Sequence, residues 1–231
     1  MINSVRNTVL DIINKDNNGY ITPDEFNNYA IQAQRDIFEE YFTNYAMAVQ
    51  KTNARIYGSE YADIKKRIEG VIDIFNVPAA PLVYDPLNFS FNQPSDLYKM
   101  ERLTYNGRVE IEKVTHGKIL YLLGSPLTSP SVLYPAYTLS SNDITVYPST
   151  ITSLVTANYL RYPVDPKWTY VTVNDSPLFN PAAIDYQDFE LPLSDEMNLI
   201  IRILQLAGVS IRESEVVQMA KSEEVQDKQE Q

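Results

Sequence analysis

The sequence predicts an α+β protein, because a helical pattern over the first third of the chain gives way to strands and turns in the middle. Apolar residues recur at helical spacing up to residue 76, and prolines and β-forming residues dominate beyond it. We expect N-terminal helices over 1–76 and a small antiparallel β domain, sandwich-like or barrel-like, over 77–177. An irregular segment with C-terminal helices over 178–220 and a flexible or arm-like polar tail over 221–231 complete the division.

Three helices are expected in the N-terminal region. The segment Val5–Ile13 is apolar on one side, as in an amphipathic helix. A long helix should run from Pro23 to about Arg55, and it is apolar over much of its circumference. Such a helix is buried on more than one side, either by neighbouring subunits or by the core of its own chain. Gly58-Ser59 should end it and begin a third helix that extends to Phe75.

The middle of the chain reads as short strands separated by turns. Alternating residues lead into and out of Asn106-Gly107, which predicts a hairpin with a two-residue turn over Tyr98–Val114. A second hairpin should form around the polar turn Ser140–Asp143, and Leu154–Tyr162 should form a further strand. Ile119–Leu123 is a short apolar run within this β-rich region.

The C-terminal part combines an irregular segment with helices. The proline-punctuated stretch Leu178–Pro192 is expected to be irregular. Ser194 should cap a helix that Gly208 closes, and a further helix is expected around Glu213–Ala220.

One stretch of the N-terminal region has nearly the pattern of a calcium-binding EF-hand loop. That pattern needs oxygen ligands at positions 1, 3, 5, 7, 9 and 12, with glycine at 6. Counted from position 1, the matching residues are Asn14, Asp16, Asn18, Gly19, Tyr20 (through its backbone oxygen), Thr22 and Glu25. Asn14 is neutral where the pattern has Asp, and the chain carries no second loop of this kind. Because calcium affinity follows the charge of the ligands, the pattern is only a weak match to a calcium site.

A helix capping box explains the same residues without a metal. Thr22 would be the N-cap, Pro23 the first helical residue, and Glu25 would reach back to the Thr22 amide. Asn17-Asn18-Gly19 suits the left-handed end of a preceding helix. We therefore assign no metal-ligating residue, and a calcium-regulated binding module using loop 14–25 stays as the alternative function.

Composition removes several classes of function. The net charge of −11 argues against nucleic-acid binding as a primary task, because phosphate contacts need clustered Lys and Arg. The chain has no cysteine and a single histidine, His116, which we interpret as a turn residue rather than a catalytic base. No glycine-rich phosphate loop, membrane-spanning apolar run or signal-peptide pattern is present. We expect no enzyme activity, no cofactor and no catalytic residue.

Two further clusters have a functional and a structural interpretation. The acidic groups Glu39-Glu40 and Asp185/Asp188/Glu190 could in principle pair for acid–base chemistry, but none stands out from the acidic surface expected at this net charge. The aromatic and basic segment Arg161–Trp168 suits a recognition surface, although packing and turn formation are the more common use of such residues.

Several segments together resemble a family of phage virion proteins. They are IINKDNNGYITPDEFN (12–27), AIQAQRDIFEEYF (30–42), ITVYPSTI (144–151), YLRYPVDPKW (159–168), DFELPLSDE (188–196) and ILQLAGVSI (203–211). The set is most similar to head–tail connector or ring (adaptor) proteins of crAss-like podoviruses and related tailed phages.

The resemblance implies a structural role in the virion rather than catalysis. It implies a homo-oligomeric ring, typically twelve-fold, that stacks on the portal protein and on other ring or tail proteins. Genomic DNA would pass through the lumen without specific binding, and no membrane would be involved. An acidic lumen would repel phosphates, which agrees with the negative net charge.

Overall fold

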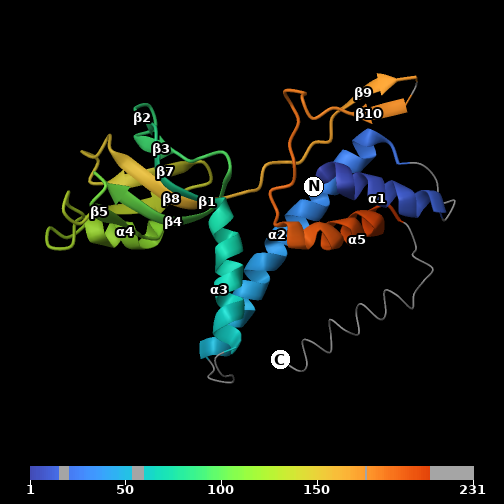
Figure 1. The fold of residues 1–231 in the computed structure, drawn as a ribbon. Helices are drawn as coiled ribbons and strands as arrows, with labels where there is room; N and C mark the ends of the chain where they lie inside the picture. Colours follow the sequence, from blue (N-terminus) through green and yellow to red (C-terminus); the bar gives the residue numbers. More distant parts are fainter. Residues whose placement is uncertain (16–20, 54–59, 175, 209–231) are drawn as a thin grey trace. The chain divides into compact units, whose positions relative to one another are not determined.

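The structure is a computed structural model that describes residues 1–15, 21–53, 60–174 and 176–208 (Figure 1). Within these residues the chain is a mixed α+β protein with five α-helices and one curled sheet of eight strands, which confirms the predicted class. It divides into two compact units. Residues 1–43 and the described residues from 164 onward form the helical unit, and residues 44–163 form the sheet unit.

The helical unit brings together the two ends of the described chain. Its helices are α1 (Ile2–Lys15), the first part of α2 (Pro23–Asn53) and α5 (Glu196–Leu206), and α1 packs against α5. Buried apolar side chains from all three helices form its interior, namely Ile2, Val5, Val9, Phe26, Ala30, Ala33, Phe38, Leu199 and Ile203. A two-stranded hairpin, β9 (Tyr170–Val173) with β10 (Ser176–Phe179), belongs to the same unit.

The sheet unit contains α3 (Glu60–Ile72), a 3-10 turn (Asp73–Phe75), α4 (His116–Leu123) and eight strands. The strands are β1 (Asn76–Pro81), β2 (Tyr84–Asp85), β3 (Ser90–Asn92), β4 (Leu97–Tyr105), β5 (Val109–Lys113), β6 (Ala136–Leu139), β7 (Asp143–Tyr147) and β8 (Val155–Arg161). Their order in the sheet is β1-β8-β4-β5-β6-β7-β3-β2. The core residues include Phe91, Leu103, Ile111, Tyr137, Ile144, Val146, Val155, Ala157 and Tyr159.

One pair of strands departs from the predicted antiparallel sheet. β5 and β6 are parallel, whereas the other named neighbours in the sheet are antiparallel. Parallel strands need a crossover connection, and α4 with the loop after it supplies this connection. The apolar run Ile119–Leu123 is therefore part of a helix. Thr115 caps that helix by accepting a hydrogen bond from the Lys118 amide at 3.4 Å.

Both predicted hairpins are present, with one difference in the first. Asn106 and Gly107 have φ of 51° and 65°, and the Arg108 N–H donates to the Tyr105 carbonyl at 3.2 Å. Three residues, not two, separate the paired Tyr105 and Val109. The predicted turn residues are thus correct, and the loop is one residue longer than predicted.

The capping box at the start of α2 is confirmed. The Thr22 amide and hydroxyl donate to the Glu25 carboxylate at 2.9 and 2.8 Å, and the Glu25 amide donates to the Thr22 hydroxyl at 3.3 Å. Within the described residues α2 follows the predicted long helix, from Pro23 to Asn53.

Some predictions differ from the structure or lie outside it. Ser194 does not cap α5, because a 3-10 turn (Leu193–Asp195) precedes the helix and Asp195 occupies the cap position. The hairpin β9–β10 is not among the expected elements, and only Leu178 and Phe179 of its second strand lie in the stretch predicted to be irregular. The predicted helix 213–220 and the tail 221–231 lie outside the described residues, as do residues 16–20 of the EF-hand-like loop. No described helix has both the length and the apolar character that crossing a bilayer requires.

Candidate functional site

Trp168 is the centre of a buried cluster in the helical unit, so the Arg161–Trp168 segment is not one exposed surface. The Trp168 side chain is 1% exposed, and its indole N–H donates to Asn3 at 3.0 Å. The Arg6 guanidinium lies 3.8 Å from the centre of the indole ring, which is cation–π geometry. Arg161 ends β8 in the sheet unit. The structure thus uses the tryptophan for packing.

The backbone at Trp168 is held by one side chain of α2. Asn27 accepts a hydrogen bond from the Trp168 amide at 2.8 Å and donates one to its carbonyl at 3.1 Å. A buried peptide group needs such partners, since an unpaired one costs free energy comparable to a lost hydrogen bond. Asn27 therefore fixes the segment that leads into β9.

The predicted acidic groups have individual structural partners. Lys167 lies 2.6 Å from Asp185, and their hydrogen bond lowers the pKa of Asp185 and raises that of Lys167. Arg202 of α5 lies 2.6 Å from Glu40 of α2. The Glu190 carboxylate accepts from the Val164 amide at 2.8 Å. These three carboxylates thus each have a separate partner within the helical unit.

Asp188 holds the beginning of α1. Its carboxylate accepts hydrogen bonds from the Met1 ammonium at 2.9 Å and from the Ile2 amide at 2.7 Å. Burial alone would raise the pKa of Asp188, but these donors and the Phe189 amide outweigh it and leave the pKa below its usual value. The carboxylate is therefore charged at neutral pH, and its negative charge stabilises a helix N-terminus.

Glu25, the last ligand position of the EF-hand-like loop, has a structural role in capping α2. The Glu25 carboxylate accepts hydrogen bonds from Thr22, and the backbone bond, followed by the side-chain bond, lowers the pKa of Glu25. Among the side chains that the structure describes, no three His, Asp or Glu residues group as metal ligands. The described part of the loop is explained by helix capping.

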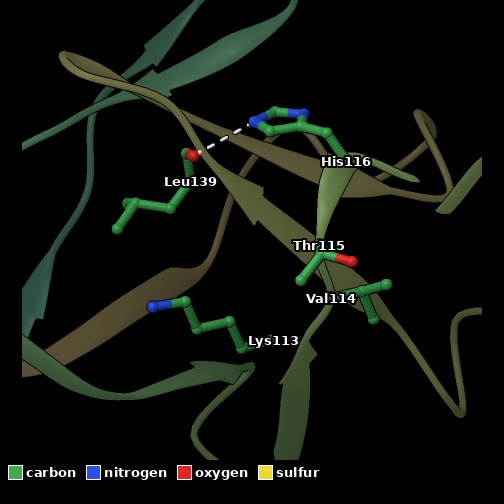
Figure 2. Close-up of a pocket in the computed structure, with 5 residues that line it drawn as sticks. All are labelled: Lys113, Val114, Thr115, His116 and Leu139. Atoms are coloured by element: carbon green, nitrogen blue, oxygen red, sulfur yellow. Dashed lines mark hydrogen bonds between the residues drawn. The ribbon is translucent and has the colours of Figure 1, made fainter. Parts of the chain in front are cut away.

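The sheet unit has an open pocket of about 410 Å³ beside the start of α4 (Figure 2). It is lined by Lys113, Val114, Thr115, His116 and Leu139. His116 Nε2 lies 3.1 Å from the Leu139 carbonyl oxygen, which can only accept, so a hydrogen bond between them uses the tautomer with the proton on Nε2. His116 is the first residue of α4 rather than a turn residue. The lining residues include no carboxylate to orient the imidazole.

The other side of α4 forms an exposed apolar surface. Ile119, on the inner side of the helix, is buried together with Val114 and Ala136 in a small cluster apart from the main core of the sheet. Leu120 and Tyr121 are 71% and 83% exposed. Leu127, Leu133 and Tyr134 in the following loop are 97%, 73% and 81% exposed. We call these five residues the α4 surface.

The loop after α4 is held by its own hydrogen bonds. The Ser131 amide donates to the Tyr134 carbonyl at 3.2 Å, and the Tyr134 amide donates back at 3.1 Å. The Ser129 amide donates to the Ser125 carbonyl at 2.9 Å, and the Thr128 hydroxyl donates to the Leu122 carbonyl at 3.3 Å. These bonds fix the loop backbone while its large apolar side chains remain in water. Where such side chains adjoin one another on a surface, they mark interaction sites.

Sequence reasoning did not find the α4 surface. The sequence does contain a signal for this surface. Thr115 is a suitable N-cap residue, and the apolar residues that follow it are more than one side of a helix can bury. Only the fold shows which of those residues remain exposed.

Comparisons with known proteins give no family for this chain. No protein-family model matches the sequence, and no curated protein matches it either.

Proposed function

We propose that this chain is a virion structural protein, the subunit of an oligomeric ring at the head–tail connector beneath the portal. The ring would form part of the DNA conduit and a docking platform for tail proteins. Its partners would be further copies of itself, the portal protein and other ring or tail proteins of a crAss-like podovirus or related tailed phage. The sequence motifs named above support this assignment.

The α4 surface is the observation that carries the proposal. Five large apolar side chains occupy one helix side and the loop after it, and all are more than two-thirds exposed. Each Å² of apolar surface left in water forgoes about 25 cal/mol, so large apolar side chains left this exposed favour association. Association with another protein would remove this surface from water.

Two finer features belong to the same proposal. The curled sheet would form a barrel-like wall in each subunit, and the polar tail 221–231 would reach a neighbouring subunit as an arm. The assembled lumen would be acidic, in line with the net charge of −11, so that DNA passes without sticking.

The test is the oligomeric state of the full chain, alone and with the portal protein, by native mass spectrometry and electron microscopy. We expect a closed ring, and the double variant Leu120→Ser/Tyr121→Ser should weaken its assembly because the apolar contact is lost. Leu87→Ser provides a matched control, since Leu87 is equally exposed in the loop between β2 and β3. Monomers under every condition, with partners present, would sink the proposal.

A further inference from the structure

The side chain of Asn106, at the corner between β4 and β5, is exposed to water. Its carboxamide makes no hydrogen bond to any residue in the part of the chain that the structure describes. Hydrogen bonds do hold the carboxamides of Asn3, Asn27, Asn88, Asn158, Asn180 and Asn198. The Asn106 carboxamide can therefore rotate without breaking a contact, whereas these others cannot.

The residue that follows Asn106 leaves its backbone nitrogen accessible. Gly107 has no side chain, and no atom lies within 4 Å of the place where a Cβ would stand. The hydrogen bond that closes the turn runs from the Arg108 amide to the Tyr105 carbonyl, and in this described turn the Gly107 N–H donates no backbone hydrogen bond. Glycine also lets the peptide group between Asn106 and Gly107 rotate at small steric cost.

These two residues carry the atoms needed for an intramolecular ring closure. The Gly107 nitrogen loses its proton to solvent and attacks Asn106 Cγ. The new N–Cγ bond closes a five-membered succinimide, the Cγ–Nδ2 bond breaks, and the leaving nitrogen takes a proton from solvent and departs as ammonia. Water then opens the ring at either of its two carbonyl carbons. Holding the nitrogen and the carbon within one short segment makes such an attack far more effective than the same reaction between separate molecules.

We propose that Asn106 is a site of spontaneous deamidation in the folded protein, where it is converted to aspartate and isoaspartate. The overall reaction consumes one water, releases ammonia and adds one negative charge to the chain. It needs no enzyme, and it does not depend on the proposed ring.

The two products should affect the corner differently. Aspartate tolerates a positive φ, so this product keeps the turn and only adds a carboxylate. Isoaspartate carries the former side-chain methylene within the backbone. The longer backbone would displace the amide of residue 106, which in the structure donates to the Leu154 carbonyl at 2.9 Å.

Incubation of the full chain at mildly alkaline pH, followed by mass spectrometry of its peptides, tests the site. Asn142 is the matched control, because it is also exposed at a hairpin corner but is followed by Asp143, which has a side chain. We expect Asn106 to be converted about tenfold faster than Asn142, because a side chain on the following residue hinders the attack. The rate should rise with pH, since the attacking nitrogen must be deprotonated. Peptide mapping reports separately on Asn18, which also precedes a glycine but lies outside the described residues.

Two variants identify the reaction and its product. Asn106→Gln should remove the fast conversion, because the longer side chain would have to close a six-membered ring. Asn106→Asp should keep the fold and elute with the aspartate product on anion exchange. Equal rates at Asn106 and Asn142, or conversion of Asn106 only after unfolding in urea, would overturn the inference. Both of these results would leave the ring proposal intact.

Discussion

At the residue scale, single polar side chains hold the irregular segments of the helical unit. Gln34 is fully buried, donates to the Val164 carbonyl at 2.8 Å and accepts from the Glu190 amide at 3.0 Å. Asn27 does the same for both backbone groups of Trp168. Side chains of α2 therefore replace the hydrogen bonds that a sheet would give to these segments.

We predict that Asn27→Ala destabilises the protein by about 1–3 kcal/mol, because it leaves two backbone groups at the buried Trp168 without partners. The measurement is urea unfolding followed by the fluorescence of Trp168, the single tryptophan of the chain. Asn28→Ala, at the next and exposed position, should be close to neutral. Equal effects of the two substitutions would contradict this role of Asn27.

At the scale of elements, the start of α2 and the β4–β5 corner follow local rules. Thr22 and Glu25 exchange hydrogen bonds three residues apart, which is the geometry that their spacing predicts. Asn106 and Gly107 both have positive φ, as a tight corner between twisted strands requires. These elements are predictable because the interactions that make them lie within a few residues.

We predict that Thr22→Ala lowers the stability of the protein by about 1 kcal/mol, because α2 loses its N-cap. The loss should be seen in thermal unfolding by circular dichroism. The bond to Glu25 adds a pH dependence, since a lowered pKa means that stability is lost as pH falls through the folded-state value. Glu25→Gln should reduce that acid dependence, and an unchanged pH profile would count against the capping box.

A second element-scale prediction concerns Gly107. Gly107→Ala should destabilise by about 1 kcal/mol, because alanine is strained at φ of 65° even though the space around it is open. Gly70→Ala is the matched control, since Gly70 lies in α3, also with open space around it, and alanine favours helix there. Chemical denaturation of both variants gives the comparison, and a neutral Gly107→Ala would show that the turn tolerates a side chain.

At the scale of the whole molecule, the net charge determines whether the protein binds DNA. With a net charge of −11 the protein lacks the cationic excess that phosphate contacts need. We predict no retardation of duplex DNA in a mobility assay at about 0.15 M salt, where screening still leaves short-range repulsion. Binding that strengthens as salt is lowered would contradict this prediction and the acidic lumen with it.

The sequence alone could not place the residues that the structure brings together over long distances. The sequence groups Trp168 with Arg161, yet the partners of Trp168 in the structure are Asn3, Arg6 and Asn27. The sequence groups Asp188 with Asp185 and Glu190, yet its carboxylate accepts a hydrogen bond from the Ile2 amide. Spacing along the chain carries no information on contacts between its two ends, so neither set was predictable.

The sequence by itself determined the α+β class, the long helix with its capping box, and the turns at Asn106-Gly107 and Ser140–Asp143. All of these follow from periodicity and from hydrogen bonds between near neighbours. Only the tertiary structure decided that the ends of the chain share one unit, that α4 crosses over to a parallel strand, and which apolar side chains stay exposed. The reason is that burial depends on how the whole chain packs. The sequence gives the type of an apolar residue, but it does not show whether a neighbouring element buries that residue or leaves it exposed.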